Sequence, residues 1–428
     1  MKNERAESSD ASSIQPDAIY VGIDWADAKH DICLLEPGSD KSATTQIENT
    51  PEALHEWIAQ LLSTYGGRGR ICVAVEKARG ALLYTLMRYS GDLTLYPLNS
   101  KVTGKLRDAL RAGGAKNDAW DSRLLAEMVK NFHHLLPVWK PDEEQTRKLA
   151  ALCEDRRKAV NQRTKLVQEL KSLLKSSFPQ FLDLLDGDCQ SPLAVALLQK
   201  WPTLSSMQSA RPAAVRRFLI AKKCRRMDRI EQALGQLASA RAVTQDPAVI
   251  EPAALRVRVL SAQLQVLLPF LAQYDKDIAD LFDQHPDAPV FRSVPGAGEA
   301  MAPRLAAAFG SDRSRFANAT EFSSYCGIAP ITKSSGKTTL HRRRRACSKF
   351  LRQSLHEFSA ASIPFSHWAK AYYQTQRQKG KGHHHAVRSL AYKWIRVLFA
   401  CWKNSTPYDE NTYINTLKNH GVALAETL

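Results

Sequence analysis

Short apolar runs in the first part of the chain predict the strands of an α/β domain. Residues 19–36, IYVGIDWADAKHDICLLE, predict an apolar strand that ends in Asp24, a tight polar turn, and a second strand of alternating character. Residues 70–80, RICVAVEKARG, predict another short strand that ends on Glu76, and LTLYPLNS predicts a further one. We expect 19–36 to form a hairpin at the edge of an α/β sheet.

Helical periodicity accompanies these strands. One helix is expected near residues 51–65, and a second over NDAWDSRLLAEMVKNF, where apolar residues such as Leu124 and Leu125 share one side. Asp118 and Asp121 lie three residues apart, in the first turn or on the opposite side of this second helix. In a helix that spacing makes the two carboxylates neighbours.

From about residue 141 the pattern changes to long helices with few strand signals. Heptad spacing first relates Leu149, Leu152, Ala159, Leu166, Leu170 and Leu173. Later, residues 257–281 place apolar side chains alternately three and four apart for more than three heptads. This pattern is typical of a coiled coil, with a kink expected at Pro269, and the alternative is a helix packed inside its own domain. The segment between, about 176–250, contains KKCRRMDR and several prolines and predicts a helical insertion.

The last third of the chain predicts a mainly helical region. FRSVPGAGEAMAPRLAAAFG has the Gly-x-Gly turn and small-residue helix of a helix-hairpin-helix element, in which backbone amides can hold a phosphate; an ordinary turn is the alternative. A serine-containing loop and two basic helices follow, ending near residue 404. The remaining residues predict a tail that is partly ordered at best.

Positive charge changes the picture from a generic α/β protein to a partner of polyanions. The 428 residues include 60 Lys and Arg against 43 Asp and Glu, a formal charge of +17, and residues 331–405 hold sixteen Lys or Arg and one acid, Glu357. Nucleic acid fits better than an acidic membrane surface, because no run of about eighteen apolar residues exists and the arginines are mixed with aromatic residues suited to stacking. The polar N-terminus lacks the apolar core of a secretory signal, so we expect a cytoplasmic protein.

Cysteine and histidine usage argues against a zinc or disulfide scaffold. The eight cysteines show no C-x-x-C pair and no regular spacing, which favours reduced thiols. The run from His383 to His385 is either a metal site or a surface run. Three adjacent side chains on one helix or strand cannot all face one ion, which favours the surface run.

Four carboxylates form the strongest chemical pattern. Asp24 and Glu76 each end a predicted strand, while Asp118 and Asp121 begin a predicted helix. Each alone is an ordinary surface acid, but together they match the oxygen ligands that Mg²⁺ prefers. Two such ions about 4 Å apart can hold the attacking and leaving oxygens of a phosphoryl transfer. We therefore predict a Mg²⁺ site at these four residues, with Mn²⁺ as a substitute.

The stretch PITKSSGKTTLHRRRRACSK contains the second candidate site. A nucleotide-binding Gly-Lys-Thr loop is excluded by spacing, since Ile331 occupies the position where the motif needs its first glycine. The remaining interpretations are a solvated basic loop and a nucleophile at Ser335. Gly336 leaves room for a phosphate to approach, and the arginines at 342–345 supply charge for its flanking backbone.

These motifs together resemble a known family, the DEDD insertion-sequence transposases. The matching stretches are YVGIDWADAKHD, VEKARG, KNDAWDS, and SVPGAGEAMA followed by FSSYCGIAPITKSSGK, covering about residues 20–135 and 288–400. Members pair a RuvC-like domain with a serine-bearing C-terminal domain, and some use a bridge RNA encoded by the element. The resemblance implies that Ser335, five residues after Pro330, attacks DNA and holds it as a phosphoserine ester, and that Ser334 helps to shape the loop.

The resemblance also implies a fold and its division into domains. The expected fold is an α/β RuvC/RNase H-like domain, a helical coiled-coil middle region and a mainly α C-terminal domain with the catalytic serine loop. The expected ranges are a tail at 1–18, the catalytic domain at 19–140, the helical region at 141–288 with its insertion at about 186–250, the serine-bearing domain at 289–405 and a tail at 406–428. The serine domain is expected to complete a composite site across subunits of a dimer or tetramer.

Nucleic-acid contacts are expected along the basic C-terminal region. The predicted phosphate contacts are Lys333, Lys337, Arg342, Arg343, Arg344, Arg345, Lys349, Arg352, Arg388 and Lys393. Such contacts bind DNA of any sequence and weaken steeply with salt. No base-reading motif stands out, so target choice by pairing to a bound guide RNA is the hypothesis that accompanies the family resemblance.

Two other function classes fit part of the sequence. A RuvC-like structure-specific nuclease would use the four acids with water and would not need Ser335. A nucleic-acid-binding protein without chemistry would need only the charge.

Overall fold

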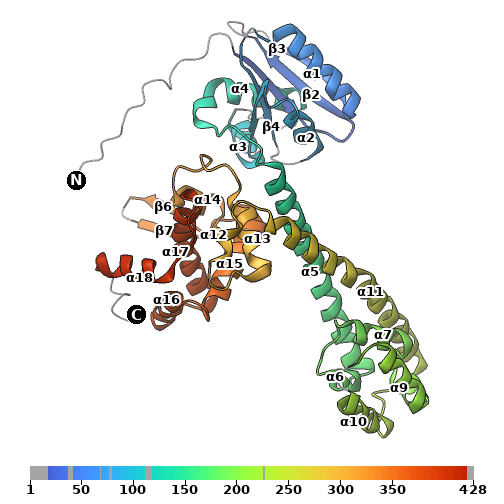
Figure 1. Ribbon diagram of the computed structural model, residues 1–428. Coiled ribbons are helices and arrows are strands. Elements are labelled where there is room, and N and C mark those ends of the chain that lie inside the picture. Colours follow the sequence, from blue (N-terminus) through green and yellow to red (C-terminus); the bar gives the residue numbers. More distant parts are fainter. Residues whose placement is uncertain are drawn as a thin grey trace. The chain divides into compact units, whose positions relative to one another are not determined.

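A computed structural model describes residues 18–36, 42–67, 69–76, 80–110, 118–224, 227–336 and 338–421 (Figure 1). The chain forms two compact units, Met1–Pro141 and Asp142–Leu428, which we describe separately.

A mixed five-stranded sheet forms the centre of the first unit. Its strand order is β3-β2-β1-β4-β5, with β1 antiparallel to β2 and parallel to β4. The strands are β1 (Ile19–Asp24), β2 (Lys29–Leu35), β3 (Ser42–Glu48), β4 (Ile71–Val75) and β5 (Leu93–Pro97). The predicted hairpin is present, but its edge position is wrong: β1 is the central strand, and the mostly exposed β3 lies at the edge beside β2.

Two hydrophobic cores cover the two faces of this sheet. Successive side chains of a strand point to opposite faces, so Val21 and Ile23 lie in one core and Tyr20 in the other. The helices of this unit are α1 (Pro51–Tyr65), α2 (Ala81–Met87), α3 (Ser100–Leu110), α4 (Asp118–Phe132) and the short η1 (His133–Leu135). Side chains of α1 and α2 complete the first core and those of α4 complete the second, so α4 packs against the face opposite α1.

The second unit contains two long antiparallel helices, α5 (Glu144–Ser177) and α11 (Pro247–Asp283), which pack along one another (Figure 1). The seam predicted within 257–281 is buried at residues including Val257, Leu264 and Ile278. The seam packs against α5 of the same chain, so it is not available to a second copy. The helix continues through Pro269, and the kink expected there stays a prediction.

A second apolar stripe lies on α11 outside this seam. Leu255, Val259, Val266 and Phe270 are exposed by 65%, 39%, 64% and 62% and recur at spacings of four, seven and four residues. Within the described part of the chain, α11 is the helix whose length and composition would allow it to cross a membrane. Apolar residues on two faces, one buried against α5, account for that composition.

Five short helices pack around the distal halves of α5 and α11, and we call them the tip. They are α6 (Gln180–Leu184), α7 (Pro192–Lys200), α8 (Leu204–Gln208), α9 (Pro212–Ala221) and α10 (Met227–Ala238). The tip shares one core with Leu166, Leu170 and Leu174 of α5. The predicted insertion is therefore a helical subdomain whose apolar side chains pack against α5 and α11.

The remaining elements form the C-terminal part of the second unit, which we call the serine region. They are α12 (Ala288–Arg292), α13 (Gly298–Phe309), α14 (Ala319–Tyr325), β6 (Ile331–Ser335), β7 (Thr338–Arg342), α15 (Lys349–Ser362), α16 (His367–Gln378), α17 (His383–Lys403) and α18 (Glu410–Asn419). Its core includes three fully buried tryptophans, whose indole N–H groups donate to Tyr408, Ser362 and the Gly310 carbonyl. The expected tail is ordered over α18, because the Glu410 carboxylate accepts from the His367 N–H at 2.7 Å.

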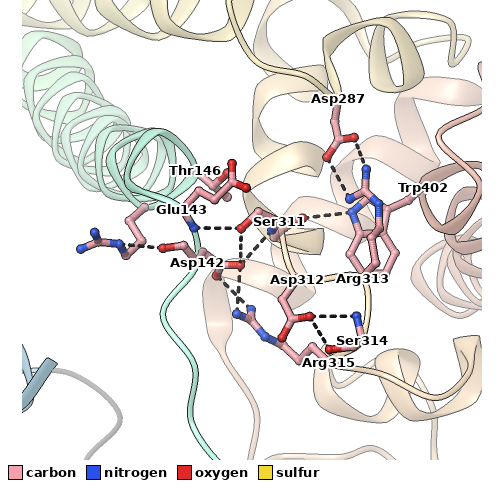
Figure 2. Close-up of polar contacts among 12 residues, drawn as sticks. Asp142, Glu143, Thr146, Asp287, Ser311, Asp312, Arg313, Ser314, Arg315 and Trp402 are labelled. Atoms are coloured by element: carbon pink, nitrogen blue, oxygen red, sulfur yellow. Dashed lines mark hydrogen bonds and ion pairs between the residues drawn. The ribbon is translucent and has the colours of Figure 1, made fainter. Parts of the chain in front are cut away.

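Polar contacts fasten the start of α5 to the serine region (Figure 2). Asp142 accepts from the Ser311 N–H at 2.8 Å and from Arg315 at 2.9 Å, while Ser311 Oγ accepts from the Glu143 N–H at 2.9 Å. Arg313 pairs with the buried Asp287. These charge-assisted bonds set the direction in which α5 leaves the serine region.

Candidate active site

The carboxyl ends of two neighbouring strands position Asp24 and Glu76. Asp24 is the last residue of β1, and Glu76 directly follows β4. The two strands are parallel and pair Ile23 with Val75, so the residue after each pair lies at the same edge of the sheet. This confirms the predicted strand ends.

Helix α4 brings Asp118 and Asp121 to that edge. One carboxylate oxygen from each of Asp24, Asp118 and Asp121 lies within 4.8 Å of the others. The close approach depends on Gly22 of β1, because a Cβ there would lie 1.9 Å from the Ser122 carbonyl oxygen of α4. A glycine at this position therefore allows the helix backbone to reach the strand.

Glu76 lies beside this group of three without belonging to it. Its Oε1 accepts a hydrogen bond from Thr103 Oγ1 at 2.6 Å. A cavity of about 100 Å³ opens next to it, lined by residues that include Trp25 and Gly80. Three of the four predicted acids are thus brought together, and the fourth stands at the adjoining strand end.

Two residues of α3 contact these acids and were not predicted from the sequence. Thr103 donates to Glu76, and Arg107 Nη1 donates to Asp121 Oδ2 at 2.7 Å. They are four residues apart and so share one face of α3. That spacing is the one signal in the sequence, and it is too common to have singled them out.

The acidic group fits a divalent cation. Asp121 is buried, and its Oδ1 has no hydrogen-bond partner among the described residues, although Arg107 satisfies Oδ2. An unpaired buried carboxylate oxygen is costly unless a cation compensates it. The donors are all oxygens, as hard ions such as Mg²⁺ require. Within the described ranges this is the group with the geometry of metal ligands, and the run from His383 to His385 is not part of it.

The predicted serine loop is a β-hairpin of the second unit. Ser335 ends β6 opposite Thr338 of β7, and Gly336 turns the chain with φ of +54°, a conformation that glycine adopts without strain. Ser334 and Ser335 are both exposed. Lys337 and the side chain of Lys333, two predicted phosphate contacts, lie outside the described residues.

Predicted basic residues gather beside the hairpin from three elements. Arg343 follows β7, Arg352 lies on α15 and Arg388 on α17. Burial lowers the pKa of Arg388, and the charges of Arg343 and Arg352 lower that pKa further. Closely spaced like charges of this kind are stabilised by an anion. The other described members of the predicted set lie at the end of β7 (Arg342), in the loop that follows it (Arg344 and Arg345), on α15 (Lys349) and on α17 (Lys393).

A buried histidine and the buried thiols of the chain are less suited to chemistry. The rings of His356 and His384 are tilted, with centroids 5.6 Å apart, and burial lowers the pKa of His356. All eight cysteines are free, and burial raises the pKa of the Cys153 thiol to about 12. A thiol with that pKa is protonated at neutral pH and is a poor nucleophile.

Comparisons with known proteins agree with this arrangement. Residues 21–179 match the transposase family of DEDD and IS110 type, and residues 288–374 match the transposase IS116/IS110/IS902 family. The chain is 27% identical to the mini-circle protein for IS117 of Streptomyces coelicolor, whose name describes it as a transposase, over 92% of this chain and 95% of that protein. It is 26% identical to the insertion element IS900 uncharacterized 42 kDa protein of Mycobacterium paratuberculosis, over 92% and 98%.

The acidic cluster on a mixed sheet, with the separate basic helical region, is therefore that of a DNA transposase, an enzyme that recombines DNA. The chain belongs to the IS110 family of DEDD transposases. DNA is accordingly its partner, and the family's DEDD acids imply a divalent metal.

Proposed function

We propose that this transposase cuts and rejoins DNA strands through a covalent phosphoserine intermediate formed by Ser335. In this step Ser335 Oγ loses its proton and bonds to a backbone phosphorus, the bond from that phosphorus to a deoxyribose oxygen breaks, and the freed oxygen takes up a proton. The reverse reaction with another strand end restores a phosphodiester. The number of phosphoester bonds is conserved, so no ATP is needed. The exposed position of Ser335 beside a turn glycine and the basic cluster supports this role.

Asp24, Glu76, Asp118 and Asp121 would hold Mg²⁺, with Mn²⁺ as a substitute. When bound, the ion stabilises negative charge on the attacking and leaving oxygens. The observation that carries this assignment is the buried, unpartnered Oδ1 of Asp121 within the three-carboxylate group. Arg107 and Thr103 orient Asp121 and Glu76 through the other carboxylate oxygens.

The basic cluster supports binding of the nucleic-acid backbone beside Ser335. Arg343, Arg352 and Arg388 present guanidinium groups, which bind phosphates with two parallel hydrogen bonds. These contacts are independent of sequence, so we propose that an element-encoded guide RNA selects the DNA ends and target by base pairing. The enzyme would act on DNA in the bacterial cytoplasm.

We also propose that the protein is a homo-oligomer, a dimer or tetramer. Its inner seam is occupied by α5, so the exposed stripe Leu255, Val259, Val266 and Phe270 is the surface of α11 left for a second copy. The stripe recurs with near-heptad spacing, as helix pairing requires. An oligomer would also allow Ser335 of one subunit to work with the acids of another.

A covalent-trapping assay tests the serine mechanism. Protein, Mg²⁺, RNA transcribed from the flanks of the gene and labelled DNA spanning the element junction are resolved on a denaturing gel, and the adduct is mapped by mass spectrometry. We expect a DNA–peptide adduct at Ser335 that is lost in Ser335→Ala and retained in the matched control Ser334→Ala. Both serines are exposed neighbours on β6, so Ser334→Ala controls for the loss of one hydroxyl from the hairpin.

The acidic cluster by itself favours a second candidate, a RuvC-like nuclease that activates water. The carboxylates belong to the first unit and Ser335 belongs to the second. A nuclease that uses only the carboxylates, a metal ion and water would therefore not need the serine. Cleavage that persists in Ser335→Ala, with no adduct in the wild type, would establish this alternative. Asp121→Asn is expected to abolish either activity.

A further inference from the structure

The tip carries a strongly basic surface that the proposed chemistry does not use. Residues 209–226 contain seven Lys or Arg and no acid. The members in the described part of the chain are all exposed: Arg211, Arg216, Arg217, Lys222 and Lys223. We call these five residues, together with Ile220, the α9 face. It lies between the two matched family ranges, 21–179 and 288–374.

The helix geometry shows that the α9 face points away from the core. Val215 and Leu219 are buried in the tip, which turns Arg216, Arg217 and Ile220 outward. Ile220 is 61% exposed although the cations surround it within one helical turn.

The chemistry of the face favours double-stranded nucleic acid. The two aromatic rings nearby, Trp201 and Phe218, are buried and half-buried, and Lys200 lies over both at 4.7 and 4.8 Å. They are not displayed as stacking platforms, which single-strand binding requires. Lys222 of the face also lies over the Phe218 ring, at 5.9 Å. Lysine and arginine beside rings that are covered in this way bind the phosphates of a duplex instead.

The long helices α5 and α11, which we call the arm, separate the tip that carries this face from the serine region. Cys153 of α5 lies in the core of the serine region and Leu174 lies in the core of the tip. At about 1.5 Å per residue, the helix separates these positions by roughly 30 Å. That length corresponds to about nine base pairs of duplex at roughly 3.4 Å each.

We propose that the α9 face binds the backbone of duplex DNA outside the exchanged segment, about nine base pairs beyond the contact made by the serine region. The proposal rests on the proposed function in taking DNA as the substrate that reaches both surfaces. The arm then acts as a spacer between two contacts on one duplex. The contact adds affinity without sequence preference.

Hydroxyl-radical footprinting of the full-length protein on a labelled duplex of about 60 base pairs spanning the element junction tests this. The variant combines Arg217→Gln, Lys222→Gln and Lys223→Asn; asparagine suits the last position, where φ is +54°. We expect the protected region to shorten by about nine base pairs on one side. The slope of log affinity against log salt should fall by about three, close to one for each lost phosphate contact.

A matched control removes the same charge elsewhere on the arm. Lys165→Gln, Lys175→Gln and Lys276→Gln alter exposed residues of α5 and α11, and the footprint should keep its full length. If thermal melting shows that the triple variant is unfolded, the pair Lys222→Gln and Lys223→Asn, beyond the end of α9, replaces it with an expected slope change of about two.

The outcomes separate this proposal from the proposed function. A footprint of unchanged length in the folded triple variant overturns the proposal. The proposal is also overturned if the variant loses affinity for a duplex RNA of equal length while its DNA footprint stays intact. Footprinting needs no strand cleavage. A shortened footprint in a protein that forms no Ser335 adduct would therefore support the α9 contact and contradict the serine mechanism.

Discussion

Gly22 links the packing of the first unit to the position of its acids. The α4 backbone lies so close to β1 that a Cβ at position 22 would overlap the Ser122 carbonyl oxygen and lie 2.5 Å from the Ala126 nitrogen. Both are backbone atoms, which cannot move aside without moving the helix. Asp121 is on that helix, so the absence of a side chain at Gly22 allows Asp121 to lie close to Asp24.

Gly22→Ala is expected to lower the free energy of unfolding by about 1–3 kcal/mol, the usual cost of overpacking, and to abolish adduct formation by displacing Asp118 and Asp121. Urea unfolding and the trapping assay measure the two effects. Gly91→Ala is the control, because nothing lies within 4 Å of a Cβ at that position. Equal behaviour of the two variants would contradict the close-approach argument.

His285 makes stability depend on pH. Burial lowers the pKa of His285 below its ordinary value of 6.5, although Asp287 and Glu143 act in the opposite direction. Its Nδ1 accepts the Asp287 N–H at 3.1 Å, a bond that the protonated ring cannot accept. The unfolded state therefore binds more protons than the folded state just below pH 6.5, and stability falls as pH decreases through that window.

His285→Asn is expected to weaken this dependence, since the remaining slope comes from other histidines such as His30, whose pKa burial also lowers. Urea midpoints between pH 5 and 8 measure it. The exposed His420→Asn is the control and should retain the wild-type slope. An identical slope in His285→Asn would show that this residue is not responsible.

At the scale of elements, the pairing of α5 with α11 determines which surface remains for assembly. Ion pairs between Arg156 and Asp275 and between Arg256 and Glu169 accompany the buried seam. Such exposed pairs contribute little to stability, typically below about 1 kcal/mol each, so the apolar seam is what holds the arm together. The outer stripe of α11 remains exposed in the single chain.

Val266→Glu combined with Phe270→Glu is expected to convert the oligomer to a species with the 47.8 kDa mass of one chain, because charges in an apolar helix interface are strongly unfavourable. Light scattering measures the mass. Val249→Glu, at an exposed site near the start of the same helix, should leave the assembly intact. If the double variant keeps the wild-type mass, the subunits associate through another surface.

At the scale of the whole molecule, the chemistry is divided between two units. The acids and their positioning residues Thr103 and Arg107 belong to the first, whereas the serine hairpin and the basic cluster belong to the second. The hydrophobic cores of the first unit contain no residue of the second unit, and those of the second contain none of the first. Separate cores are expected to unfold in separate transitions, so a ligand of one unit can be recognised by the transition that it shifts.

Mg²⁺ is expected to raise the unfolding temperature of the first unit only. At one hundred times its dissociation constant, the ion stabilises the unit that binds it by about 2.7 kcal/mol. Calorimetry with and without Mg²⁺ measures this. Asp121→Asn should remove the shift, and Glu127→Gln on the same helix should preserve it. A shift that survives in Asp121→Asn would place the ion elsewhere.

The sequence alone was sufficient where the signal is local. Apolar runs ending in Asp24 and Glu76 predicted two strand ends, because a buried strand must be continuously apolar and the first charged residue marks its exit. The spacing of Asp118 and Asp121 predicted their shared helical turn. The charge of +17 predicted a polyanionic partner, since net charge does not depend on the fold.

Tertiary structure decided what depends on distant partners. It placed β1 at the centre of the sheet and paired the apolar seam of α11 with α5. It also brought Thr103 and Arg107 into contact with the acids. A heptad pattern predicts that a helix has an apolar face but does not identify the helix that covers it. A single Thr or Arg in the sequence does not indicate which carboxylate its side chain will contact. Those outcomes depend on contacts between residues far apart in sequence, which periodicity and composition do not encode.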